Sequence, residues 1–276
     1  MRKRIIAAFF MIIAVIFILC SSKEVILGAV ALIALLSAYE VSGAFGLCNK
    51  EKWPACLYII LFIPAICLSE MYFSKYSGKD MVSLIACVYI LLGFLILLLF
   101  NRKVKASELF SALIISSVLI YFFSYMVRIR FMLEEGKFLL WAVLVGACLT
   151  DTFAYFCGRF FGKRHLAPKI SPNKTVEGAI GGLFGGMVSM VIYGVIIGLI
   201  NPEFELNFLN LAILGLISAI FAQMGDLSLS LIKRETGIKD FGNFIPGHGG
   251  ILDRIDSILF VAPVTYYFLL YMPIIA

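Results

Sequence analysis

Two stretches of this chain concentrate residue types that bind phosphate groups and divalent metal ions. The longer stretch, residues 230–256, reads SLIKRETGIKDFGNFIPGHGGILDRID. Its charged and titratable residues beyond Glu235 are Lys233, Arg234, Lys239, Asp240, His248, Asp253, Arg254 and Asp256. Glycines and prolines between them let the backbone fold tightly. Carboxylates for a metal, cations for phosphate and a glycine-rich connector suit phosphoryl or nucleotidyl transfer, where positioning and charge neutralisation supply most of the rate.

Helical spacing brings the aspartates of this region onto shared faces. Asp226, Ser230 and Lys233 lie at i, i+4 and i+7, and Asp253 and Asp256 lie at i and i+3. Three such carboxylates would repel one another without a cation between them, and Mg²⁺ is the metal that suits oxygen ligands of this kind. We therefore predict that Asp226, Asp253 and Asp256 bind Mg²⁺. Taken alone, Asp253 with Arg254 could equally be a solvated helix start with an aspartate favoured by the helix dipole.

The second stretch begins inside an apolar run and reads DTFAYFCGRFFGKRHLAPKISPNKTVEGAIGG from Asp151. Asp151, Tyr155 and Arg159 are four residues apart and share a helix face. An aspartate at membrane depth is costly, so it is a functional hypothesis by default. Asp151 is therefore a candidate site residue.

A helix is predicted to start at Ser171 in this second stretch, with Ser171 as the N-cap and Pro172 at the first helical position. Lys174 would then lie in the first turn, where free N–H groups already favour an anion, with Glu177 close by. Basic residues that could hold a triphosphate are Arg159, Lys163, Arg164, Lys169 and Lys174. The alternative interpretation is a positively charged cytoplasmic loop that binds lipid headgroups.

The helix expected after Ser171 carries glycines every four residues, at Gly178, Gly182 and Gly186. This small-xxx-small spacing lets two transmembrane backbones approach closely. We interpret it as a packing seam, because a phosphate-cradling loop would need a different order of Gly and Lys.

The elements that position these residues are membrane helices. The chain is 62% hydrophobic and 14% charged, and its mean hydropathy is +1.02, far from the composition of a soluble domain. We predict an all-α integral membrane protein, a polytopic bundle of about nine spans of about 20 residues each. The expected spans are near 5–20, 25–47, 53–70, 81–100, 108–127, 138–158, 176–200, 208–232 and 255–275.

The distribution of basic residues predicts a cytoplasmic N-terminus. With that orientation, the opposite side holds six of the 23 Lys and Arg residues, namely Lys23, Lys75, Lys79, Arg128, Arg130 and Lys137. Both long polar loops, 159–175 and 233–254, then face the cytoplasm. The net charge of +6 is explained by topology and an anion site, so no nucleic-acid partner is indicated.

The chain divides by content into residues 1–137, about five transmembrane helices with little chemistry, and residues 138–276, the predicted catalytic region. The one notable residue in the first part is Glu40, in AYEVSGAFGLCNK. A carboxylate there costs a few kcal/mol unless it faces protein or water. It could reach the interface, pair with a cation, or take part in the site, and the sequence leaves these open.

The pattern Ser230-x-x-Lys233-Arg234, Lys239-Asp240, Pro246-x-His248-Gly249-Gly250 and Asp253-Arg254-x-Asp256 resembles the C-terminal signature of the phosphatidate cytidylyltransferases, also called CDP-diacylglycerol synthases. The segment from Asp151 through SPNKTVEGAIGG is similar to the other well-marked region of that family. The resemblance covers about 138–256 by motif.

The resemblance implies that CTP and phosphatidate react to give CDP-diacylglycerol and pyrophosphate in the cell (inner) membrane, with Mg²⁺ and a monovalent cation such as K⁺. It also makes a homodimer plausible, and carries over Asp226 and Asp253 as metal ligands. The predicted catalytic groups are Asp226, Asp253, Lys233, Arg234, Lys239 and His248, where His248 could order the loop, donate to phosphate or cap a turn. The predicted substrate-binding groups are Asp151, Arg159, Lys163, Lys169, Ser171, Lys174, Glu177, Ser230, Asp240 and Arg254.

Two other classes share some of these features. A secondary transporter of an anionic solute would also carry intramembrane aspartates, but it predicts repeated halves, and we find no internal repeat. The CDP-alcohol phosphotransferases share the metal and lipid chemistry, but their aspartate-rich signature is not matched.

Overall fold

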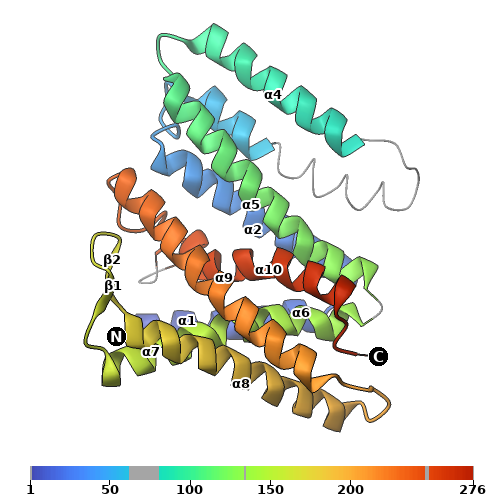
Figure 1. Ribbon diagram of the computed structural model, residues 1–276. Coiled ribbons are helices and arrows are strands. Elements are labelled where there is room, and N and C mark those ends of the chain that lie inside the picture. Colours follow the sequence, from blue (N-terminus) through green and yellow to red (C-terminus); the bar gives the residue numbers. More distant parts are fainter. Residues whose placement is uncertain (1, 62–80, 134, 246–248, 276) are drawn as a thin grey trace. The chain divides into compact units, whose positions relative to one another are not determined.

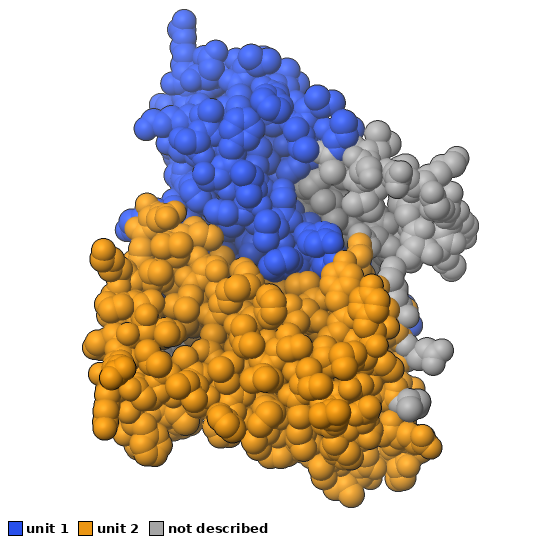
Figure 2. Space-filling model, viewed as in Figure 1, with its two compact units in different colours: residues 1–127, 236–253 blue, residues 128–235, 254–276 orange. Residues whose placement is uncertain are grey.

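The structure is a computed structural model that describes residues 2–61, 81–133, 135–245 and 249–275 (Figure 1). The chain forms two compact units, coloured separately in Figure 2. Unit 1 comprises Met1–Val127 and Thr236–Asp253, and unit 2 comprises Arg128–Glu235 and Arg254–Ala276. The loop that carries most of the predicted C-terminal signature therefore belongs with the N-terminal helices.

Unit 1 is built from long apolar helices. They are α1 (Arg2–Cys20), α2 (Lys23–Ala44), α4 (Met81–Phe100) and α5 (Ala106–Met132), and residues 53–61 are also helical. Ile26, Leu47, Ile59, Leu109 and Ile120 are among its fully buried side chains.

Unit 2 holds the remaining helices and a small hairpin. A continuous helical stretch consists of α6 (Gly136–Leu144), the π-helical segment η1 (Val145–Leu149) and α7 (Thr150–Phe161). The strands β1 (His165–Ala167) and β2 (Ser171–Thr175) pair antiparallel, and α8 (Val176–Ile200), α9 (Phe208–Glu235) and α10 (Leu252–Tyr271) follow.

Five described helical stretches are long and apolar enough to cross a membrane. They are Lys23–Ala44, Ala106–Phe131, Gly136–Phe161, Val176–Ile200 and Phe208–Glu235. Large apolar side chains such as Phe17, Leu98 and Leu199 are exposed on helices, as expected for surfaces that face lipid. The all-α membrane architecture is thus confirmed, while the count of nine spans and the orientation stay predictions. Part of the predicted span 53–70 lies outside the described residues.

Close packing of α8 against α7 and α9 confirms the predicted glycine seam. A Cβ atom on Gly182 would lie 3.0 Å from the Ala154 Cβ of α7, and one on Gly186 would lie 2.8 Å from the Ala219 Cβ of α9. Because no side chain separates the backbones at these points, α7, α8 and α9 pack at short range.

The predicted helix start at Ser171 was wrong. Ser171 opens strand β2, and α8 begins five residues later, where the Thr175 Oγ1 caps it by accepting a hydrogen bond from the Gly178 N–H at 3.1 Å. The Ser-Pro pair imitates a helix start locally, but Ala167 pairs with Ser171 and His165 with Thr175 across the hairpin. Lys174 consequently lies in a strand and not in a helical first turn.

The seam predicts that a single methyl group will destabilise the bundle at Gly215 but not at Gly28. A Cβ on Gly215 would lie 2.7 Å from the Gly186 carbonyl oxygen and 2.8 Å from the Met187 Cα, whereas one on Gly28 meets nothing within 4 Å. We expect Gly215→Ala to cost roughly 1–3 kcal/mol through overpacking. Gly28→Ala should be neutral or stabilising by up to about 1 kcal/mol, because Ala favours helix.

Thermal unfolding in detergent would measure both variants of this pair. Equal melting temperatures for Gly215→Ala and Gly28→Ala would contradict the close approach of α9 to α8.

Candidate active site

Three aspartates from three helices of unit 2 form the centre of the candidate site. Asp151 comes from α7, Asp226 from α9 and Asp256 from α10. Asp256 lies close enough to both Asp226 and Asp151 to interact with them electrostatically. Residues 75 or more apart in the sequence, Asp151 and Asp226, are thereby brought together with the last helix.

Gly225 allows α10 to approach α9 at this position. A Cβ atom on Gly225 would lie 2.7 Å from the Asp256 carbonyl oxygen and 2.7 Å from the Phe260 ring. Any side chain larger than hydrogen would push the two helices apart, so the glycine beside Asp226 is what admits Asp256. The sequence analysis did not single out this residue.

Lysines and a serine surround the carboxylates. Lys174 in β2 forms an ion pair with the Asp226 Oδ2, and the Ser230 Oγ donates to the Asp226 Oδ1 at 3.3 Å. Lys233, one turn further along α9, is 9% exposed and interacts electrostatically with Asp256. The shared face predicted for Asp226 and Ser230 is therefore confirmed, and Lys174 reaches it from the hairpin.

Asp151 is held by a partner that the sequence analysis missed. The Ser257 Oγ donates to the Asp151 Oδ2 at 2.7 Å. Ser257 directly follows the signature residue Asp256, and that adjacency was the only sequence signal for it. On the α7 side, the Thr150 Oγ1 donates to the Gly146 carbonyl at 2.6 Å, inside the π-helical segment. Such segments are frequent at functional sites, and here one directly precedes the site aspartate.

The hairpin that carries Lys174 is tied to its neighbours through backbone groups. The Glu177 Oε2 accepts hydrogen bonds from the backbone N–H groups of Lys163 and Arg164 at 2.9 and 3.2 Å. The Arg234 Nε donates to the Ile170 carbonyl at 3.2 Å. Glu177 and Arg234 thus hold the loop in place.

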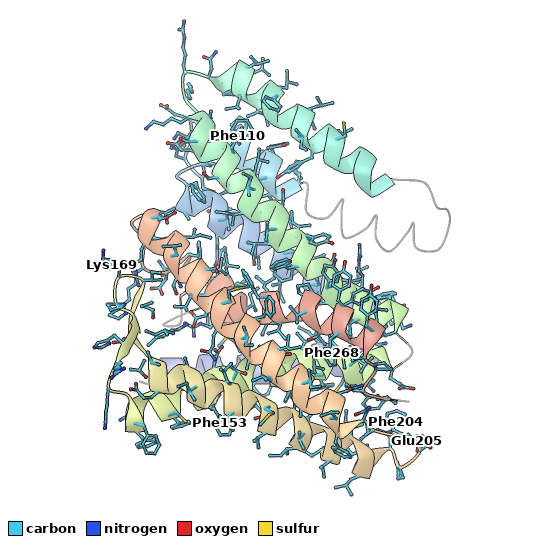
Figure 3. All side chains as sticks on the ribbon, viewed as in Figure 1. Phe110, Phe153, Lys169, Phe204, Glu205 and Phe268 are labelled. Carbon is cyan, nitrogen blue, oxygen red and sulfur yellow. The ribbon has the colours of Figure 1, made fainter. Side chains whose placement is uncertain are left out.

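Other basic residues of this loop are exposed. Lys163 and Lys169 are exposed, and Lys169 lies between the two strands, where Figure 3 labels it. The Arg159 Nη1 donates to the Tyr155 hydroxyl at 2.9 Å, as their spacing of four residues predicts. Arg254 is also exposed. The cations of unit 2 thus divide into Lys174 and Lys233, which engage the carboxylates, and an exposed group.

The signature loop in unit 1, residues 239–253, is organised by Asp253. The Asp253 Oδ2 accepts hydrogen bonds from the backbone N–H groups of Phe241 and Gly250, at 2.9 and 3.0 Å. Lys239 and Asp240 are exposed. The predicted role of His248 lies outside the described residues.

The donor groups of unit 2 fit Mg²⁺ better than an ion enclosed entirely by protein. Among the residues that the structure describes, no three His, Cys, Asp or Glu side chains converge on one metal position. Mg²⁺ is usually bound through one or two carboxylates and completes its shell with water and substrate phosphates. Asp226 and Asp256 supply such a pair, and the absence of a third convergent ligand agrees with that mode of binding.

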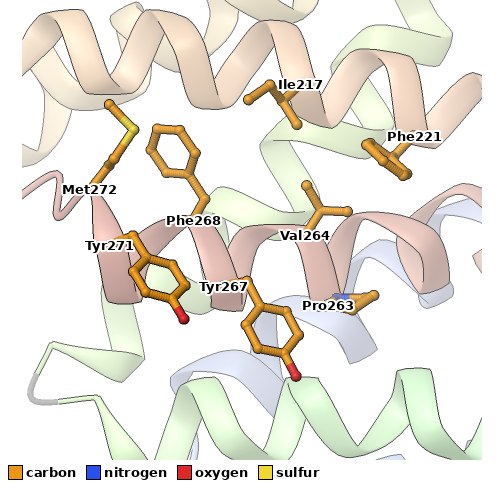
Figure 4. A pocket seen from close by; sticks show the side chains of 8 residues that line it. All are labelled: Ile217, Phe221, Pro263, Val264, Tyr267, Phe268, Tyr271 and Met272. Atoms are coloured by element: carbon orange, nitrogen blue, oxygen red, sulfur yellow. The ribbon is translucent and has the colours of Figure 1, made fainter.

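An apolar pocket of about 440 Å³ lies between α9 and α10 in unit 2 (Figure 4). Its lining residues are Ile217, Phe221, Pro263, Val264, Tyr267, Phe268, Tyr271 and Met272. Apart from two tyrosine hydroxyls, the lining side chains carry no hydrogen-bonding group. The pocket therefore suits a hydrocarbon ligand and not the polar chemistry of the aspartates.

Comparison with known proteins gives a consistent family. The model of the Cytidylyltransferase family matches residues 2–272. A phosphatidate cytidylyltransferase of Staphylococcus haemolyticus is 39% identical over 203 residues, which cover 71% of this chain and 72% of that protein. The phosphatidate cytidylyltransferase of Bacillus subtilis is 36% identical over 200 residues, with the same coverage. That of Haemophilus influenzae is 42% identical over 136 residues, or 49% of this chain and 46% of its own length.

These matches run through the stretches that supply the carboxylates, the lysines and the signature loop, since the family match covers nearly the full length of the chain. The chain belongs to the cytidylyltransferase family.

Proposed function

We propose that this protein transfers the cytidylyl group of CTP to phosphatidate, giving CDP-diacylglycerol and pyrophosphate for phospholipid synthesis. The observation that carries the proposal is the cluster of Asp151, Asp226 and Asp256 with Lys174 and Lys233, built on membrane helices. Such a cluster suits a reaction between a polyphosphate and the phosphate of a lipid. The named relatives of this family are phosphatidate cytidylyltransferases.

The chemistry asks little of a general base. A phosphate oxygen of phosphatidate, already ionised at neutral pH, attacks the α-phosphorus of CTP and forms the new P–O bond. The bond from the α-phosphorus to the oxygen that bridges to the β-phosphate breaks, and its electron pair leaves with pyrophosphate. Lys174 and Lys233 would stabilise the charge that develops on the phosphates. In this proposal Lys174 exchanges its Asp226 partner for a phosphate, while Arg234 and Glu177 keep the hairpin in place.

Mg²⁺ would be held by Asp226 and Asp256, and Asp253 stays a predicted third ligand from its spacing on α10. When bound, the ion supplies charge neutralisation for the transferred phosphoryl group. The K⁺ ion rests on the family resemblance alone. The exposed Arg159, Lys163, Lys169, Lys239 and Arg254 are proposed to attract the triphosphate and anionic headgroups to the surface.

We place the site on the cytoplasmic face of the cell membrane, with a cytoplasmic N-terminus and about nine spans. The proposal rests on the distribution of Lys and Arg residues between the loops and on the cytoplasmic supply of CTP. A homodimer rests on the resemblance alone, because the glycine seam packs α8 against helices of the same chain.

The apolar pocket between α9 and α10 is proposed to hold an acyl chain of phosphatidate. Asp226 and Asp256 lie on the same two helices, and Pro263 and Tyr271 follow Asp256 by 7 and 15 residues. At a rise of 1.5 Å per residue, the pocket lies about 10–22 Å along α10 from that carboxylate. This distance is comparable with one leaflet of the hydrocarbon core, about 15 Å. A lipid with its phosphate beside the aspartates would therefore place a chain at this depth.

The first prediction concerns turnover and the metal. Purified protein in detergent with phosphatidate, CTP and Mg²⁺ should release pyrophosphate and form CDP-diacylglycerol, and EDTA should abolish both. Asp226→Asn should lower kcat on the order of 100-fold or more, because it removes the charge that pairs with Lys174 and holds the metal. Glu205→Gln is the matched control, since Glu205 is an exposed carboxylate before α9 (Figure 3).

Metal-independent turnover would contradict the Mg²⁺ assignment. Bound CTP without lipid product would mean that the acceptor is another lipid, and neither binding nor product would favour the transporter.

A second prediction concerns the acyl chain. Val264→Phe should fill part of the pocket and lower kcat/KM for phosphatidate with long acyl chains by on the order of tenfold, the worth of one or two buried methylene groups. Phosphatidate with six-carbon chains should be unaffected. Val188→Phe adds the same ring at an exposed position of α8 and is the control. A parallel loss with both chain lengths would show that the pocket does not select hydrocarbon.

A further inference from the structure

Glu40, in the middle of the apolar helix α2, is a buried carboxylate with a defined set of partners. Its side chain belongs to a residue that is 2% exposed. The Oε1 accepts a hydrogen bond from the backbone N–H of Ile251 and the Oε2 accepts one from that of Leu252, each at 2.8 Å. Both donors belong to the signature loop, more than 200 residues away in the sequence, and all three residues belong to unit 1.

These contacts offset the cost of burying the charge. An isolated carboxylate in an apolar environment is strongly unfavourable. Here Leu252 is the first residue of α10, so its N–H group has no partner within the helix and lies at the positive end of the helix dipole. Two charge-assisted hydrogen bonds at a helix N-terminus satisfy the carboxylate and the helix together.

The glycines of the signature are placed where the carboxylate needs space. A Cβ atom on Gly250 would lie 2.6 Å from both oxygens of Glu40, and a Cβ on Gly242 would overlap the Oε1. For both glycines, the three nearest atoms belong to Glu40. Two glycines of the loop therefore enclose this one side chain.

Glu40 and Asp253 hold the same loop by different backbone groups. Asp253 binds the N–H groups of Phe241 and Gly250, and Glu40 binds those of Ile251 and Leu252. Three consecutive N–H groups, at 250, 251 and 252, thus point to two carboxylates. The loop shape depends on both acids, one from within the loop and one from α2.

We infer that Glu40 is a positioning residue of the active site, which fixes the signature loop so that Lys239 and Asp253 are presented to the nucleotide and its metal. The roles of Lys239 and Asp253 rest on the proposed function, whereas the anchoring by Glu40 rests on the contacts above. Glu40 itself touches neither the nucleotide nor the reacting atoms in this proposal.

The test compares Glu40→Ala and Glu40→Gln with the wild type, using only protein that elutes as a single folded species. We expect Glu40→Ala to raise KM for CTP by on the order of tenfold, with a smaller effect on KM for phosphatidate. Gln keeps one acceptor but places an amide NH₂ against the second N–H donor, so Glu40→Gln should fall between Ala and the wild type. Gly43→Ala, on the same helix with nothing within 4 Å of the added Cβ, should be unchanged.

A double-mutant cycle isolates the contact. Gly250→Ala alone should raise KM for CTP as Glu40→Ala does, because its methyl displaces the carboxylate. In the Glu40→Ala background the same methyl meets free space, so the double variant should be no worse than Glu40→Ala. Additive losses, or a Glu40→Gln variant equal to the wild type, would overturn the inference, since a side chain that only fills space would behave in that way.

Hydrogen exchange separates this inference from the proposed function. Glu40→Ala should speed exchange at the Ile251 and Leu252 amides by at least about tenfold, whatever reaction the protein performs. Faster exchange in a protein that makes no CDP-diacylglycerol would leave the anchor standing and refute the function. Unchanged exchange would refute the anchor even in an active enzyme.

Discussion

The structure depends on one constraint, that a charged group placed within a membrane helix must find a partner inside the protein. Asp151 has Ser257, Asp226 has Lys174 and Ser230, and Glu40 has two backbone N–H groups of the signature loop. Each partner comes from an element distant in sequence or from the next helical turn. The polar contacts therefore select one arrangement of helices within each unit, while the apolar surfaces, which meet lipid, could slide past one another at little cost.

Glycine provides the room for these contacts. Gly225 admits the backbone of Asp256 beside Asp226, and Gly242 and Gly250 admit Glu40 into the loop. In each case the excluded atom would be a Cβ, and the group that takes its place is either a polar side chain or the backbone that carries one. The abundance of glycine in this membrane protein is thus partly a consequence of buried charge and not only of helix packing.

Much of this could be predicted from the sequence, and the limits have physical reasons. Composition gave the membrane class, and spacings of four residues gave the contacts from Tyr155 to Arg159 and from Asp226 to Ser230, because such contacts are local. Ser171 was misread as a helix cap because the pairing of the hairpin decides its conformation. Ser257 and Glu40 could not be assigned, since their partners lie 106 and more than 200 residues away and no local pattern encodes them.

The partners of each carboxylate also indicate what it can do. Asp226 is paired with the side chains of Lys174 and Ser230, which can turn about their own bonds and exchange the aspartate for a phosphate or a metal-bound water. Glu40 is paired with backbone N–H groups, which cannot turn without moving the loop, and one oxygen of Asp253 is paired in the same way. Partners that can exchange suit a group that takes part in a reaction, and fixed partners suit a group that holds a reactive loop in shape. Asp253 combines the two, because the carboxylate that fixes the loop has a second oxygen with which it can reach a ligand.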